Sequence, residues 1–249
     1  MQKKICRRLS VVLLMVVTLP LQAQNNSLVD EKLVHFGFSL SADFLSYGVI
    51  EAPDSVQIER NGTVYHVRTT TPGAGFSAGF IADLRLTRYL NLRFCPAIRY
   101  GQRSITYQND SIATEDIHGI SCQTNKPKVV CLPIELPLYL KWSAEREGNY
   151  RPYVSVGGGV GFDIGRKKDR VILQKTMDYF MEIGIGCDLY FSWFKLAPEI
   201  RYRIGFNNVL TPISDYEKEQ WKISADDYFY TNALSRLTNQ QISLVFNFE

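Results

Sequence analysis

The feature that most constrains this chain is a strict alternation of apolar side chains with small or charged ones. After His35, residues 36–44 carry only apolar side chains on one parity, and glycine, serine and aspartate on the other. The apolar parity consists of Phe36, Phe38, Leu40, Ala42 and Phe44. Successive side chains of a β-strand point to opposite faces, so this segment predicts a strand with one apolar face and one polar face.

Seven further segments follow the same rule, and charged residues are absent from the apolar parity in all of them. The eight segments are residues 35–44, 75–86, 90–103, 130–142, 153–164, 177–189, 194–206 and 241–248. A soluble sheet buries its apolar face, whereas a membrane barrel turns that face outward to lipid and keeps charges inside. Complete exclusion of charge favours the membrane barrel.

The number and length of the segments fit a closed barrel. A tilted transmembrane strand needs about 9 to 11 residues, and the last segment reaches this length when it is extended back to Thr238. Eight is an even number and the smallest closed size. Beyond residue 23, no apolar run approaches the roughly 18 residues of a membrane helix. We therefore predict an all-β fold: an eight-stranded antiparallel transmembrane up-and-down β-barrel over residues 35–249.

The N-terminus has the features of a secretory signal peptide. Lys3, Lys4, Arg7 and Arg8 precede an apolar stretch over residues 9–21, which predicts cleavage after Ala23. Residues 24–34 then form a short periplasmic segment. Without the four basic residues of the leader, the formal net charge falls from +3 to −1. The basic balance is therefore a property of the leader and does not indicate nucleic-acid binding.

The connections between the segments alternate in length. Long connections over residues 47–74, 104–127, 166–175 and 207–237 alternate with short ones at residues 87–88, 143–149 and 190–193. Outer-membrane barrels have short periplasmic turns and longer extracellular loops. With a periplasmic N-terminus, all long connections lie outside the cell. The longest could hold a helix over residues 214–223, and its exposed aromatics Trp221, Tyr228, Phe229 and Tyr230 either fold over the barrel mouth, form an aromatic girdle or contact a partner.

The polar parity predicts a filled interior. It contains eight acids, namely Asp43, Asp83, Glu135, Asp163, Asp178, Glu182, Asp188 and Glu199. It also contains eight bases, namely Arg85, Arg93, Arg99, Arg103, Lys141, Lys195, Arg201 and Arg203. Buried charges need partners, and equal numbers allow a network of ion pairs. Large side chains of the third and seventh segments can occupy the space left by glycines elsewhere, so an interior of this size is filled and does not conduct.

Candidate chemical motifs are weak. The glycines at residues 157–161 lack the lysine and hydroxyl residue of a phosphate loop. The histidines His35, His66 and His118 lie at a strand start and in loops, with no spacing that would gather a catalytic cluster. We expect no catalytic, cofactor-binding or metal site and no cofactor. Among the cysteines left after leader cleavage, Cys95 and Cys131 point inward on neighbouring strands and pair only if the register permits; the state of Cys122 stays open, and Cys187 faces lipid.

Prolines are the main conflict with the predicted strands. Pro96, Pro133, Pro137 and Pro198 lie inside segments, and each removes a backbone donor from the sheet. A one-residue bulge at any of them would exchange the two faces, but the alternation continues across all four. Either the strands compensate locally, or the third, fourth and seventh are interrupted near one rim.

Four stretches resemble PorT-type outer-membrane proteins, which are barrels of the type IX secretion system. They are HFGFSLSADF, LPIELPLYLKW, NYRPYVSVGGGVGFDIG and FKLAPEIRYRIGFNNVL, and the resemblance extends over about residues 35–248. The most specific part is the pair of motifs Pro-Glu-Ile-Arg and Gly-Phe-Asn-Asn in the last stretch. The resemblance implies a non-enzymatic outer-membrane component needed to export cargo proteins, acting with other outer-membrane or periplasmic secretion proteins.

Three classes of function remain open at the sequence level. The first is this role in secretion, and the second is a generic small outer-membrane barrel with a structural or adhesion role. The third is a lipid-modifying barrel enzyme or a narrow channel. In the first two the partners are membrane lipids and proteins, without nucleic acid or a small-molecule substrate.

Overall fold

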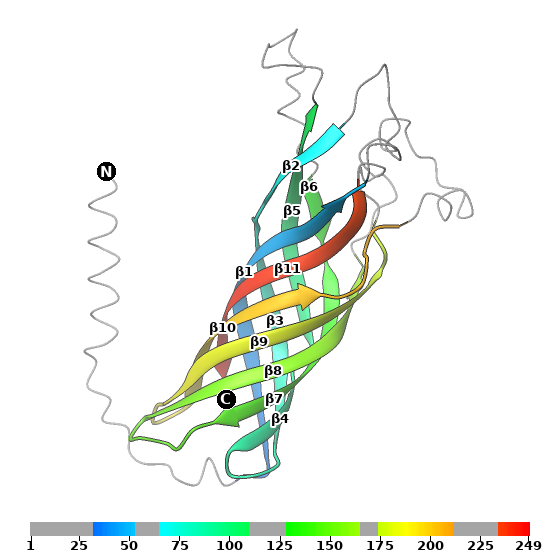
Figure 1. Cartoon of the computed structure of the whole chain (residues 1–249). Helices are drawn as coiled ribbons and strands as arrows, with labels where there is room; N and C mark the ends of the chain where they lie inside the picture. The colour runs from blue at the N-terminus through cyan, green and yellow to red at the C-terminus, as the bar shows by residue number, and fades with distance from the viewer. Residues whose placement is uncertain (1–31, 53–64, 110–127, 165–173, 212–233) are drawn as a thin grey trace, which may run out of the picture.

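The chain folds as a single antiparallel β-sheet that closes into a tilted barrel (Figure 1). The computed structural model describes residues 32–52, 65–109, 128–164, 174–211 and 234–249. The first six strands are β1 (Val34–Glu51), β2 (Tyr65–Thr71), β3 (Gly73–Arg85), β4 (Leu90–Phe94), β5 (Ala97–Asn109) and β6 (Lys128–Cys131). The remaining five are β7 (Pro133–Ser143), β8 (Tyr150–Asp163), β9 (Met177–Tyr190), β10 (Lys195–Gly205) and β11 (Leu234–Phe248).

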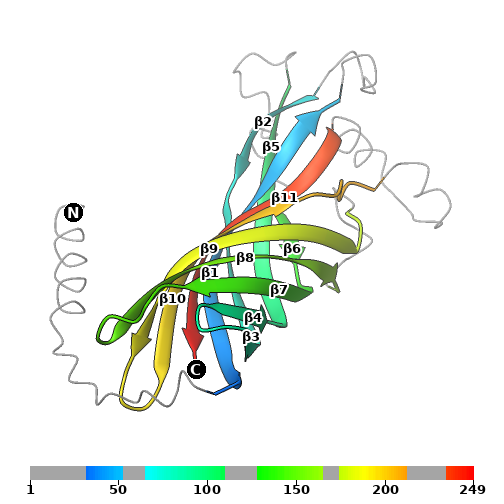
Figure 2. The same cartoon turned by 60° about the horizontal axis from the view of Figure 1, so that its bottom comes forward.

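The eleven strands correspond to eight barrel strands. Three barrel strands are interrupted, so that β2 and β3, β4 and β5, and β6 and β7 each form one of them. Each barrel strand pairs with its neighbours in the sequence, and β1 pairs with both β3 and β11 to close the ring (Figure 2). The prediction of an eight-stranded up-and-down barrel is confirmed.

The interruptions fall at prolines, and the alternation survives them. The third barrel strand breaks at residues 95–96 and the fourth at Leu132, next to Pro133. The pairing register of β3 with β4 continues without a shift into β5. The register of β5 with β6 likewise continues without a shift into β7. The seventh strand, β10, runs through Pro198 without a break. The seventh strand thus follows the first alternative, local compensation. The third and fourth are interrupted, as in the second alternative, but the third is not interrupted at a rim, because Pro96 lies beside Phe80 in the middle of β3.

The two ends of the barrel differ. Three short connections, residues 86–89, 144–149 and 191–194, lie at one end, called here the short-turn end. The described chain begins and ends there, since the Leu33 carbonyl accepts a hydrogen bond from the Arg85 amide and Glu249 pairs with Lys195. The other four connections lie at the opposite, long-loop end. The predicted alternation of connection lengths thus places both ends of the barrel domain on one side.

Several strands extend further toward the long-loop end than the sequence predicts. β1 continues to Glu51, β5 to Asn109, and β11 begins at Leu234; β2 lies inside a predicted loop and contains His66. The physical reason is a reversal of polarity. In β1, just beyond Phe44, the outward residues Ser46 and Gly48 are no longer apolar and the inward residues Leu45 and Tyr47 are no longer small or charged. The alternation that marked the membrane strands therefore no longer identifies this part of the strand.

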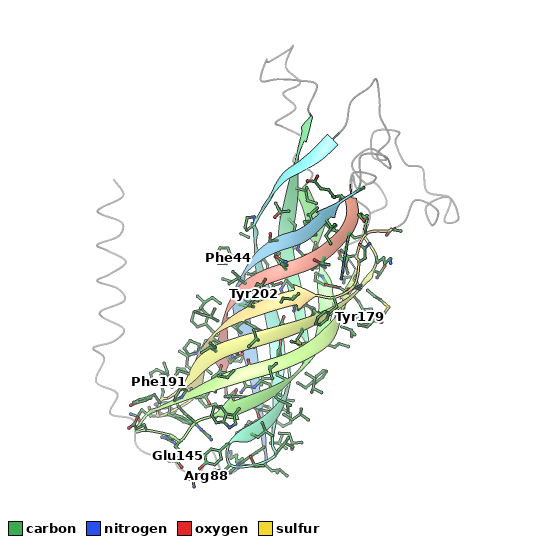
Figure 3. All side chains as sticks on the ribbon, in the orientation of Figure 1. Phe44, Arg88, Glu145, Tyr179, Phe191 and Tyr202 are labelled. Carbon is green, nitrogen blue, oxygen red and sulfur yellow. The ribbon has the colours of Figure 1, made fainter. Side chains whose placement is uncertain are left out.

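The outward parity forms an apolar wall around the barrel. Phe36 and Phe80 are each about three-quarters exposed, at 75% and 74%. Figure 3 shows Phe44, Tyr202 and Tyr179 on this wall, with Arg88 and Glu145 at the short-turn end. In the described residues, no helix is long and apolar enough to cross a membrane. The outer surface therefore has the character that a core has in a soluble protein.

Some sequence predictions concern residues outside the described ranges. These are the leader (1–23), most of the segment 24–34, the helix at 214–223, and the residues Cys122, His118, Trp221, Tyr228, Phe229 and Tyr230.

Candidate functional site: the barrel interior

A chain of shared ion pairs crosses the middle of the barrel. Arg99 joins Asp43 of β1, at 2.9 Å, to Glu135 of β7. On its other oxygen, Glu135 accepts a hydrogen bond from Arg203 Nη2 at 2.6 Å, and Arg203 Nε donates to Glu182 of β9. We call this chain, extended below by Arg201 and Glu199, the central ion-pair network.

Arg201 completes the central network on the β9–β10 side. Its guanidinium lies 2.9 Å from Glu199 and 3.6 Å from Glu182, and it donates to the Tyr139 hydroxyl at 2.8 Å. Tyr139 in turn donates to Glu182. Each carboxylate thus has a cation or a hydroxyl partner, which is the condition for keeping charges buried at tolerable cost. Bases of the third and seventh barrel strands, Arg99 and Arg203, meet at Glu135.

A second group of charges closes the short-turn end. Arg93 binds Asp83 at 2.6 Å and also Glu249, which lies just past β11 and pairs with Lys195. We call these four residues the inner network. Beside it, Lys141 binds both carboxylate oxygens of Asp188 at 2.7 Å. Glu249 was not among the predicted lumen acids, although it lies two residues after the inward Asn247 and therefore on the same parity.

Toward the long-loop end, the inward side chains are joined by hydrogen bonds instead of ion pairs. Closest to that end, they make mainly apolar contacts. Arg103 donates to the Asn239 side-chain oxygen at 2.8 Å, and Asn239 donates to Asp178 at 2.7 Å. The Arg103 guanidinium also lies 5.3 Å from the centre of the Tyr47 ring. Above it is the outer apolar cluster, formed by Tyr47, Ile105, Val209, Leu210, Leu234 and Leu237. This cluster occupies the interior where the outer wall has become polar.

Two asparagines direct part of this cluster into the barrel. Asn207 accepts a hydrogen bond from the Tyr179 amide and donates to the Met177 carbonyl, both on β9. Asn208 accepts from the Leu237 amide of β11 at 3.0 Å and from the Leu210 amide. The chain leaving β10 is thereby fixed between its two neighbours, and the residues that follow, from 209 to 211, are buried. These asparagines belong to the Gly-Phe-Asn-Asn motif, which thus has a structural role.

Glycines make room for the large inward side chains. A Cβ atom on Gly184 would lie 2.1 Å from a Glu199 carboxylate oxygen, and one on Gly157 would lie 2.5 Å from the Tyr139 ring. A Cβ on Gly101 would lie 2.0 Å from Leu45. Large side chains therefore occupy the space left by the inward glycines, but the ones in contact are a glutamate, a tyrosine and a leucine, and not the bases that the sequence predicts.

Most of the predicted lumen charges lie in the interior networks. Two of them, Asp163 and Arg85, lie near the ends of the barrel. Asp163 accepts the Leu132 amide at 3.0 Å and so bridges the break between β6 and β7. Arg85 is half-buried at the short-turn end. Inside, charged and polar side chains are sealed from solvent: Arg93, Tyr139, Lys141, Glu182, Glu199 and Gln241 are all no more than 2% exposed.

The chain matches the family model described as "Outer membrane protein beta-barrel domain" over residues 22–211. It belongs to this family. Two solved structures of outer-membrane barrels are similar to it. Neisserial surface protein A (NspA) has a TM-score of 0.40 and 11% identity, with 87% of this chain and 98% of that chain covered. OprG from Pseudomonas aeruginosa has a TM-score of 0.38 and 9% identity, with 86% of this chain and 91% of that chain covered. No curated protein matches the chain.

Membership in this family identifies which face of the barrel wall contacts lipid and which faces the interior. The protein is located in the outer membrane, its apolar face is in contact with lipid, and its networks of buried charge lie inside the barrel. In such barrels the short turns are periplasmic, so the long-loop end is extracellular. Both ends of the described chain are then periplasmic.

The described residues considered for chemistry lie apart from one another. His35 lies opposite Asp83 at the short-turn end, whereas His66 lies on β2 at the long-loop end. The register places Cys131 opposite Gly101, while the Cys95 amide bonds to the Pro137 carbonyl. Cys95 and Cys131 are thus six residues apart along the strands, about 20 Å, too far for a disulfide between them. Within the described ranges, no group of three metal-binding side chains occurs.

Proposed function

We propose that this protein is a closed outer-membrane barrel that neither conducts solutes nor catalyses a reaction, and that has a structural or adhesion role. The observation that carries the proposal is the sealed interior. The central network crosses the lumen from β1 to β10, and the outer apolar cluster covers it on the extracellular side. To pass, ions would have to separate several buried ion pairs, and separating each pair costs free energy because it leaves buried charges without partners.

Recording from single barrels in a planar bilayer tests the closed interior. We expect no stable conductance steps from the wild-type protein at moderate voltage. Paired removal of Arg203 and Glu135, as R203A/E135A, opens the centre of the network while preserving net charge, and serves as the positive comparison. Regular ohmic steps from the wild type would contradict the proposal and favour a narrow channel. Lipid analysis of a deletion strain tests the enzymatic alternative, which requires a change in acyl or headgroup composition.

A narrower proposal is that the barrel serves protein export in a type IX system. It is supported by the resemblance to PorT-type proteins, and the most specific motif of that resemblance contains the residues that fix the extracellular closure, Asn207 and Asn208. Under this proposal the barrel does not itself transport cargo but contacts other secretion proteins at its ends.

Deleting the gene separates the two roles. A structural barrel predicts increased entry of detergents or dyes with normal activity of secreted enzymes in the medium. A secretion component predicts loss of extracellular enzyme activity and cargo retained in the periplasm. Purification from mild detergent followed by identification of bound proteins then tests the partners. Expressing the wild-type chain in the deletion strain must restore whichever property is lost.

A further inference from the structure

At the long-loop end, the first two barrel strands continue without pairing to each other. The ladder between β1 and β3 ends at Leu45, opposite Gly73. β1 continues to Glu51 with β11 as its neighbour, and β2 extends up to Tyr65 with β5 as its neighbour (Figure 1). Among the residues that the structure describes, no residue of β1 pairs with one of β2. We call the junction between the two strands beyond Leu45 the open seam.

The course of β2 explains why the seam is open. Pro72 separates β2 from β3, and the pairing of β2 with β5 shifts by one residue between Val67 and Thr69. A bulge of this kind bends and twists the strand that carries it, so β2 follows β5 and loses its register with β1. The hydroxyls of Ser46 and Thr70 still meet at 3.3 Å across the start of the seam. The two strands therefore remain neighbours there, but their backbones are unpaired beyond it.

The backbone groups of Tyr47 and Val49 point into the open seam. The Arg85 amide donates to the Leu33 carbonyl, so Leu33 directs its backbone groups toward β3. In an antiparallel ladder every second residue does the same. Tyr47 and Val49 are on this parity, but the ladder ends before them. Their N–H and carbonyl groups, about 7 Å apart along the strand, are therefore presented as an unpaired strand edge.

An edge of this kind selects a polypeptide as its partner. Donors and acceptors that alternate at strand spacing are the complement of another strand's backbone. A lipid phosphate has acceptor oxygens only, and it would leave the carbonyls of the edge without donors. The inward side of the seam is apolar, since Tyr47 belongs to the outer apolar cluster and Val49 packs against it. A strand added to β1 would therefore have apolar side chains on its inward parity.

We propose that the β1 edge of the open seam binds an extended segment of a partner protein by strand addition. The added strand runs antiparallel to β1, exchanges backbone hydrogen bonds with Tyr47 and Val49, and places alternate apolar side chains beside the outer apolar cluster. It reaches the seam from the extracellular side, because the seam begins beyond Phe44 at the long-loop end. The inference holds for an adhesion barrel and for a secretion barrel alike, because the seam lies outside the central network.

A capped, fluorescently labelled peptide of sequence Lys-Thr-Val-Thr-Val-Thr-Lys is the probe, and its binding to the detergent-solubilised barrel is measured by anisotropy. Its valines oppose Tyr47 and Val49, and its lysines keep it soluble. N-methylation of both valines removes the N–H groups that face β1, and we expect it to weaken binding by at least about tenfold. N-methylation of two threonines, whose N–H groups point away from β1, is expected to change the affinity by less than about threefold.

Val49→Pro tests the same hydrogen bonds from the side of the barrel. Proline removes the Val49 N–H, which points into the seam and does not pair with β11, so the position tolerates it. We expect peptide binding about tenfold weaker than that of the wild type. Val49→Ala is the matched control, because it shortens the side chain but keeps the N–H, and it is expected to stay within about threefold of the wild type. Equal affinities of the two variants, or of the two methylated peptides, would overturn the proposal.

Hydrogen exchange in the free barrel tests the seam itself. The amides of Tyr47 and Val49 are expected to exchange at least about tenfold faster than those of Ser46 and Gly48, which face β11, and to slow when the peptide binds. Equal protection of all four amides in the free barrel would overturn the proposal, because the edge would then already be paired. Folding of each variant is verified by the heat-dependent gel migration of the barrel, and the methylated peptides decide the matter even if the proline variant does not fold.

Discussion

Replacing Arg203 with methionine tests whether water is excluded from the central network, as the burial of its side chains indicates. Methionine retains much of the side-chain volume but leaves Glu135 and Glu182 without a shared cation. Removing one partner of a buried ion pair usually costs about 3 to 5 kcal/mol. Here Glu135 keeps Arg99, and Glu182 keeps the Tyr139 hydroxyl and Arg201 at 3.6 Å. We therefore expect the lower end of that range, about 3 kcal/mol, in the free energy of unfolding.

Urea unfolding in lipid vesicles, followed by tryptophan fluorescence, measures this free energy. Trp142 lies on the outward face of β7 and reports on insertion, whereas Trp193 lies in the exposed connection 191–194. The double variant R203M/E182Q removes the charge of one of the two carboxylates that lose Arg203. It should recover at least about 1 kcal/mol, which a double-mutant cycle resolves. Arg88→Gln, at the exposed rim, should change stability by less than about 0.5 kcal/mol. A cost of Arg203→Met under about 1 kcal/mol, typical of a solvated pair, would show that water fills the lumen and would refute the reasoning.

Three further predictions concern packing, the lipid face and the extracellular closure. Gly184→Ala should cost about 1 to 3 kcal/mol of unfolding free energy, because the added methyl would lie 2.1 Å from a carboxylate oxygen. Gly161→Ala is the control: its nearest neighbour would be 3.8 Å away, so it should be nearly neutral in the same urea titration. Ile200→Arg, on the lipid face near mid-membrane, should cost about 2 to 4 kcal/mol, and a neutral result would place this face away from hydrocarbon. Asn208→Ala should accelerate hydrogen exchange at the Leu237 amide, which loses its acceptor; unchanged exchange would mean that the closure does not depend on the asparagine.

The membrane-spanning part of the fold could be predicted because the bilayer imposes a simple rule on it. Hydrocarbon excludes charge from every second residue, and this exclusion marked the strands, their number and the identity of the lumen charges. The same rule explains why Pro96 and Pro133 did not mislead the prediction, since a bulge at either would have moved charges into lipid. Outside the hydrocarbon the rule ends. The part of β1 beyond Tyr47 and the part of β11 before Thr238 lose this alternation, so the sequence predicts loops there.

The partners within the lumen could not be predicted, because they depend on register. Counting acids and bases identified which residues are inside, but only the offsets between strands decide that Arg203 meets Glu135 and that Cys95 misses Cys131. Glu249 was missed because it lies just beyond Phe248, the last residue of the predicted strand, although it continues the inward parity of Asn247. The role of Asn208 in fixing the chain after β10 was missed, because asparagine is common in loops that follow strands.

The lumen charges have a second consequence for how the chain finds its register. A slip of one residue between neighbouring strands transfers every inward side chain of the slipped strand to the outside. For β10, this would expose Lys195, Glu199, Arg201 and Arg203 to lipid, and a basic residue near mid-membrane costs about 2 to 4 kcal/mol. An apolar interior would carry no such penalty, because both faces would then suit lipid. The buried ion pairs therefore exclude the alternative registers even where their net contribution to stability is small.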